Sequence, residues 1–204
     1  MTPLFSALDT TFGPHAFAHA LFYAHAPALR FELAGGDTRP AQFLQAIDRA
    51  RTVLAAAFAG AAEVTAVLEV WGDESPALLW ATAQADLAKL GLEPPAPEHR
   101  AHHAEGDDLP RNWFAFRLPV AQIPELLWGI FAADLGITPA LSARLTLAAP
   151  ELGVLACPYD SRGMDIIGPN AARLSQLYKG FDGWLLDYDR ARMGEMFAQT
   201  EFGL

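Results

Sequence analysis

The segment Tyr-Asp-Ser-Arg-Gly-Met-Asp at residues 159–165 holds the densest group of side chains that could do chemistry. It lies between two apolar runs of the kind that form strands. Asp at the first position and Gly at the last position of a four-residue turn are typical of a type I turn, so Asp160 and Gly163 predict a hairpin. Turn geometry does not explain Arg162 or Asp165. These side chains are therefore candidates either for a structural turn or for a functional cluster.

A second acidic group lies at residues 184–190, which read Trp-Leu-Leu-Asp-Tyr-Asp-Arg. Asp187 and Asp189 are two residues apart, so in an extended chain both carboxylates would point the same way and could hold Mg²⁺ with water. This arrangement favours one alternative function, a divalent-metal-dependent hydrolase or phosphotransfer enzyme. The competing interpretation is an ion-paired helix N-terminus, where Asp189 interacts favourably with the helix dipole.

Three further signals for catalysis or metal binding are incomplete. His15 and His19 have the i, i+4 spacing that places two side chains on one helix face, but zinc needs three or four ligands and no carboxylate is near them. Cys157 lies in an apolar run and is expected to be an inert core thiol. The sequence contains neither a glycine-rich phosphate loop nor the G-x-S-x-G of a serine hydrolase. We therefore expect no catalytic residue, no metal and no cofactor.

The alternating segment 29–33 is the first strand expected to position charged groups. It carries Arg30 and Glu32 on its polar face. The ordinary interpretation is a surface ion pair at the edge of a sheet, which contributes little to stability. The functional interpretation places both side chains on the same face as Arg162 and Asp165.

Periodicity, caps and turn residues predict the remaining elements. Further strands are expected over residues 64–71, 113–118, 144–147, 153–157 and 164–167. Helices are expected within residues 1–26 and over 38–59, 76–90, 120–135, 170–180 and 189–197, with an extended piece at 184–186. This order predicts an α/β protein of the α+β type, with a mixed sheet of about six strands, an antiparallel C-terminal hairpin and helices packed on the sheet. Residues 93–111, including Asp107 and Asp108, are expected to form an exposed, mobile loop that proteases cleave first.

Composition limits the class of protein. The 204 residues are 52% hydrophobic, enough for a single domain 1–204 with a large core. The net charge of −10, from 14 basic and 24 acidic residues, disfavours nucleic acid and anionic membranes as partners. One cysteine, a start without basic residues and the absence of a long apolar run predict a soluble cytoplasmic protein without an internal disulfide.

The two charged motifs, together with residues 21–33, resemble the bacterial domain of unknown function 3885 family, and the resemblance extends over roughly residues 20–195. In this chain Ser161 stands where the family pattern has a second Asp. The resemblance implies no particular activity. It does imply that seven charged residues belong to one recurring pattern: Arg30, Glu32, Asp160, Arg162, Asp165, Asp187 and Asp189. With Tyr159 they form the candidate functional cluster.

Within this cluster, the charge pattern predicts that Arg162 is a partly buried hub. It lies between Asp160 and Asp165, and the following helix is expected to return the chain to the sheet with Asp187 and Asp189. A bidentate arginine among these carboxylates would join the hairpin to the C-terminal segment.

These observations together favour a non-enzymatic binding or interaction module, regulatory or immunity-like, whose acidic surface docks a basic partner protein. The metal-dependent enzyme is one alternative. The other is a small-ligand binder in which Arg30 or Arg162 holds an anion.

Overall fold

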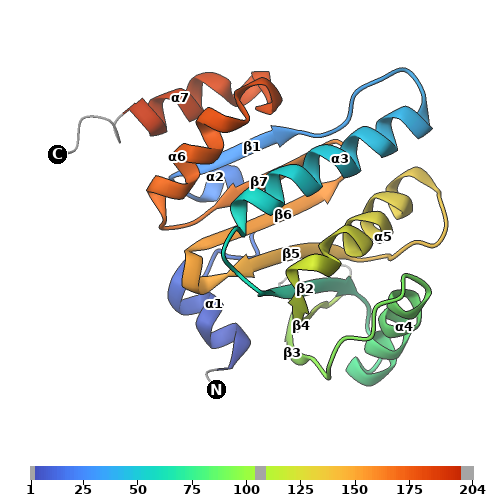
Figure 1. The fold of residues 1–204 in the computed structure, drawn as a ribbon. Helices are drawn as coiled ribbons and strands as arrows, with labels where there is room; N and C mark the ends of the chain where they lie inside the picture. Colours follow the sequence, from blue (N-terminus) through green and yellow to red (C-terminus); the bar gives the residue numbers. More distant parts are fainter. Residues whose placement is uncertain (1–2, 104–108, 199–204) are drawn as a thin grey trace.

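The computed structural model describes residues 3–103 and 109–198 of the chain, and this part contains a seven-stranded sheet (Figure 1). The sheet order is β1-β7-β6-β5-β2-β4-β3. The strands are β1 (Ala28–Glu32), β2 (Glu63–Trp71), β3 (Glu98–His102), β4 (Arg111–Pro119), β5 (Arg144–Ala149), β6 (Val154–Asp160) and β7 (Gly163–Ile167). The α+β fold is confirmed, and β6–β7 is the expected C-terminal hairpin. Every pairing between these strands is antiparallel, so the sheet is not mixed as expected.

Helices pack around this sheet, and α3 (Arg39–Ala57) and α5 (Ile123–Leu135) lie side by side across one face (Figure 1). The other helices are α1 (Leu4–Phe12), α2 (Leu21–Ala24), α4 (Pro76–Lys89), α6 (Ala171–Gly180) and α7 (Arg190–Ala198). For the cap of α3 the sequence offers Asp37 or Thr38, and for that of α4 Ser75. In the structure the Thr38 and Ser75 side chains accept hydrogen bonds from backbone amides of the first turn. Within the described residues, none of the helices is long and apolar enough to span a membrane.

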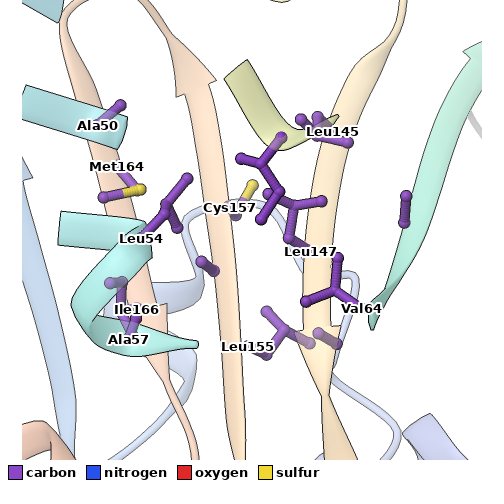
Figure 2. Close-up of a cluster of buried hydrophobic side chains, with 14 of the residues drawn as sticks. Ala50, Leu54, Ala57, Val64, Leu145, Leu147, Leu155, Cys157, Met164 and Ile166 are labelled. Atoms are coloured by element: carbon purple, nitrogen blue, oxygen red, sulfur yellow. The ribbon is translucent and has the colours of Figure 1, made fainter. Parts of the chain in front are cut away.

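The core between α3 and the sheet is apolar (Figure 2). Leu54 of α3 lies among Met164 and Ile166 of β7, and all three are fully buried. Successive residues of a strand point to opposite faces, so Asp165 points away from α3. On that opposite face it accepts a hydrogen bond from the Phe22 amide of α2. The alternation along β7 therefore separates an apolar face from a face that carries charge.

The segment 93–111 is not a loop throughout, because it contains the edge strand β3. Its sequence, Glu-His-Arg-Ala-His, lacks apolar alternation, since an edge strand leaves much of its surface in solvent. Glu98 of this strand accepts hydrogen bonds from the Leu4 and Phe5 amides and so holds the start of α1 against the sheet. Asp107 and Asp108, for which mobility is predicted, lie outside the described residues.

Residues 13–20 form turns, so the helix face expected to carry His15 and His19 does not exist. Gly13 ends α1 with a φ of 75°, a backbone conformation that glycine adopts without a steric penalty. The spacing of the two histidines therefore carries no geometric meaning.

Candidate functional site

Arg30 is the centre of a buried ion network. Its Nε and Nη2 donate to the two carboxylate oxygens of Asp165 at 2.7 and 2.9 Å. Its Nη1 donates to Asp189 at 3.2 Å. The three side chains are only 12%, 2% and 5% exposed. The bidentate, charge-assisted contact with Asp165 is among the strongest polar interactions available to a protein, and it joins the first strand to the last. The single bond to Asp189 adds the C-terminal segment.

Strand register brings these residues together. The antiparallel pairing of β1 with β7 places Arg30 directly opposite Asp165. Leu185 forms an isolated bridge with β1, and the Leu186 amide donates to the Arg30 carbonyl at 2.9 Å. Both residues have extended backbones, in agreement with the extended piece expected there. This attachment to β1 positions Asp189 over the guanidinium.

Helix α2 contributes further hydrogen bonds to both aspartates of the network. The Phe22 amide donates to Asp165, and the Tyr23 hydroxyl donates to Asp189 at 3.0 Å. The Arg30 guanidinium also lies 5.0 and 4.8 Å from the centres of these two rings, within the range of cation–π attraction. Hydrogen bonding to Asp165 raises the pKa of Arg30 further above its usual value. The network is therefore charged and mutually satisfied.

The expectation that Arg162 is the hub is wrong. Its side chain is 79% exposed, and its described partner is Asp160, which accepts from the Arg162 amide at 2.8 Å and from its Nε at 3.0 Å. The hairpin turn projects its tip residue beyond the sheet, whereas a residue in the middle of β1 has neighbours on all sides. Arg30 therefore has the role that the charge pattern assigned to Arg162.

Two other members of the candidate cluster lie apart from the network. Asp187 is 93% exposed and pairs with Arg190 at 3.0 Å. Because residues 187–189 form the 3₁₀ turn η4 (Asp187–Asp189), Asp187 and Asp189 diverge instead of pointing the same way. The paired-carboxylate geometry expected for Mg²⁺ is thus lost. Glu32 is exposed at the end of β1, where its carbonyl accepts from Arg49.

A cleft of about 670 Å³ opens beside the network. Five of the eight candidate residues line it: Arg30, Tyr159, Asp160, Arg162 and Asp165. Its other walls are His19, Ala20, Trp71, Ser142, Ala143 and Arg144. The five candidate residues belong to the motifs that the sequence predicts as functional, whereas the other lining residues, apart from His19, come from segments without a motif.

Tyr159 lies over Gly163, where a bulge in β6 shifts the register of the hairpin. A Cβ at Gly163 would collide with the Tyr159 hydroxyl, so glycine is required here for close approach. Burial, with the nearby Asp165 carboxylate, raises the pKa of Tyr159 to about 12. The phenol is therefore a neutral hydrogen-bonding group of the cleft at physiological pH.

Ser161, the departure from the family pattern, is buried in the turn. Its hydroxyl donates to Asp134 near the end of α5. A serine hydroxyl suits this carboxylate partner, whereas a second carboxylate would be repelled by it. The turn is thus anchored through Ser161, and Arg162 is left in solvent.

The sequence analysis missed Arg144 and Glu69. They face each other across β5 and β2, and Glu69 is 4% exposed. The Arg144 Nη2 donates to the Ala18 carbonyl at 3.2 Å, while its Nη1 is 3.7 Å from the Glu69 carboxylate. Burial raises the pKa of Glu69, an effect that Arg144 partly offsets. A glutamate inside an otherwise apolar strand was the one available signal.

Among residues 3–103 and 109–198, no three His, Cys, Asp or Glu side chains are grouped so that they could hold a metal ion. Cys157 is buried in β6, and burial raises the pKa of its thiol. The neutral thiol lies beside Arg144, where it acts as part of the cleft's supporting wall.

Comparison with known proteins gives one match. The family model described as Domain of unknown function (DUF3885) matches residues 4–189. Searches of curated proteins and of solved structures found no match. The match covers the network, the hairpin turn and the cleft walls, which all lie within residues 4–189. The chain therefore belongs to the DUF3885 family.

Proposed function

We propose that this protein is a non-enzymatic binding module that holds a small anionic ligand in the cleft. The carrying observation is the charge of the cleft lining. Three arginines, Arg30, Arg144 and Arg162, face two carboxylates there, in a chain with a net charge of −10. The Asp189 and Glu69 carboxylates lie against Arg30 and Arg144 but do not line the cleft, so the lining itself carries one more arginine than carboxylate. Such a lining attracts anions in preference to the remaining acidic surface.

The size and composition of the cleft support a small molecule as the ligand. Its volume of about 670 Å³ falls inside the range typical of small-molecule sites. The lining mixes aromatic side chains, Trp71 and Tyr159, with a few polar groups that could orient a ligand.

The state of the ion network supports binding over catalysis. Arg30 uses its Nε, Nη1 and Nη2 on Asp165 and Asp189, and these carboxylates are also held by α2. Groups that satisfy one another in this way build a rigid wall, whereas a general base or nucleophile needs a free lone pair directed at the substrate.

Thermal unfolding with a panel of ligands tests the proposal. The panel contains inorganic phosphate, simple carboxylates, nucleotides, Mg²⁺, Mn²⁺ and Zn²⁺, each added alone. We expect an anion to raise the midpoint, because a ligand at 100 times its Kd stabilises the folded state by about 2.7 kcal/mol. The Arg51→Gln variant, which changes an exposed arginine on α3 paired with Asp48, should keep the shift. A shift with a divalent metal alone would overturn the proposal in favour of a metal-dependent enzyme, and no shift with any anion would also refute it.

A further inference from the structure

The three arginines of the cleft are not equivalent. Arg30 is bonded to two carboxylates, and Arg162 is exposed and bonded to Asp160. Arg144 differs from both because its side chain is only 16% exposed and yet poorly paired. Its Nη2 donates to the Ala18 carbonyl, its side chain also hydrogen-bonds with the Cys157 thiol, and the Glu69 carboxylate is 3.7 Å away.

The nearest counter-charge of Arg144 is itself poorly placed. Glu69 Oε1 is buried without a close hydrogen-bond partner in the described residues. The Trp113 indole, which faces Glu69 from β4, interacts with the same carboxylate and lowers its pKa. A buried cation is costly unless it is paired and hydrogen-bonded. Of the two arginines that the cleft shields from solvent, Arg30 and Arg144, Arg144 is therefore the one with donors left for a ligand.

The groups around Arg144 suit an anion. Ser142 is exposed two residues before it in the chain and supplies a hydroxyl to the cleft. His19 also lines the cleft, and Ala20 beside it has a left-handed backbone with a φ of 54°. Such a conformation in a non-glycine residue persists only where its surroundings hold it, and such residues gather at ligand sites. The hydrogen bond from Arg144 to the Ala18 carbonyl holds the segment that carries His19 and Ala20 close to Arg144.

Trp71 gives the cleft an aromatic surface on which a flat, apolar part of a ligand could stack. It lines the cleft but is 48% exposed, a large apolar surface left in water. Trp71 is two residues beyond Glu69 on β2, and Glu69 is the residue opposite Arg144. Alternate residues of a strand share a face and are about 7 Å apart along it. The cleft therefore presents a cation and an aromatic face from neighbouring positions on two adjacent strands.

We infer that Arg144 binds the anionic group of the ligand while Trp71 stacks on a planar ring, so that the ligand is a small ring-containing phosphate or carboxylate. The inference rests on the proposed function and narrows it to a class of ligand and to one arginine. Neighbouring positions on two adjacent strands suit an anion joined to its ring by a short linker, as in a nucleoside monophosphate or an arylalkyl carboxylate.

Isothermal titration calorimetry distinguishes a phosphate ligand from a carboxylate ligand. It also measures separately what Arg144 and Trp71 contribute to binding. The probes are a set of nucleoside monophosphates, indole-3-acetate and inorganic phosphate. For the ring-containing probe that binds, we expect Arg144→Gln to lower affinity about 10- to 100-fold, the loss of charge-assisted hydrogen bonds. Trp71→Ala should lower it about 10-fold and leave the affinity for inorganic phosphate unchanged.

Two controls keep the test decisive. Arg51→Gln should leave every affinity unchanged, because it lies on another face of the protein. Arg144→Lys keeps the charge if Arg144→Gln fails to fold, and it should still lose about 10-fold because the planar fork is gone. Wild-type affinity in Arg144→Lys and Arg144→Gln, or a larger loss in Arg162→Gln than in Arg144→Gln, would overturn the inference while the proposed function stands. Failure of every anion to bind the wild type would instead refute the proposed function itself.

Discussion

Arg30 and Arg162 are both arginines that lie close to aspartates, but the two regions treat them very differently. Arg30 is in the middle of β1, where Asp165 is its neighbour on β7 and Asp189 reaches it from the C-terminal segment. Arg162 is at the tip of the β6–β7 turn and pairs with Asp160 in solvent. The comparison teaches that the number of nearby acids in the sequence says little about the strength of an ion pair. Burial and strand register decide it, because a surface pair is screened by water and a buried pair is not.

Of the changes that test this difference, removal of Arg30 should have the largest effect on stability. Arg30→Ala leaves Asp165 and Asp189 buried without their counter-charge, so we expect a loss of about 3–5 kcal/mol in the free energy of unfolding. Urea denaturation at pH 7 measures it, with Arg51→Ala as an exposed control. A loss below about 1 kcal/mol would show that the buried network contributes no more than a surface pair.

The substitution Ser161→Asp gives the β6–β7 turn the aspartate that the family pattern has at this position. Ser161→Asp places a carboxylate in a buried site beside Asp134, and we expect a loss of about 1–3 kcal/mol at pH 7. The second change Asp134→Asn should recover part of that loss, because it removes the repelling charge. Denaturation of the single and double variants checks this. Equal stability of the single variant and the wild type would mean that the turn relaxes into solvent.

The pKa of Tyr159 predicts a dependence on alkaline pH. Its folded value of about 12 lies above the ordinary value of 10.0, so the unfolded state loses its proton first as pH rises. The contribution of Tyr159 to stability is therefore full below pH 10 and is lost as pH rises from 10 to 12. We expect wild type to lose about 1–2 kcal/mol more than Tyr159→Phe over this range, a figure reduced for partial solvent exposure. Parallel pH profiles of both proteins that coincide would contradict the prediction.

Arg162→Ala should have the smallest effect on stability, in contrast to Arg30→Ala. Because the side chain is exposed and has one acidic partner, we expect a change below about 1 kcal/mol, decreasing further in high salt. Urea denaturation at low and high ionic strength measures both quantities. A loss approaching that of Arg30→Ala would restore Arg162 as a hub.

Much of the fold could be predicted from local patterns. Period-two alternation identified β1, apolar runs identified the hairpin strands, and capping residues near Thr38 and Ser75 identified helix starts. These signals are local, since a cap or an alternating run acts within a few residues. The edge strand β3 escaped because its exposed sequence has no alternation. The pairing of every strand as antiparallel also escaped, because pairing depends on segments far apart in the chain.

The charged motifs by themselves identified the candidate residues, and five of these eight line the cleft. Only the tertiary structure decided their roles. It placed Arg30 rather than Arg162 among the carboxylates, separated Asp187 from Asp189, and brought Arg144 to the cleft from a strand without a motif. The physical reason is that residue type sets the charge a side chain can carry, whereas register and burial set the distance and the dielectric across which that charge acts.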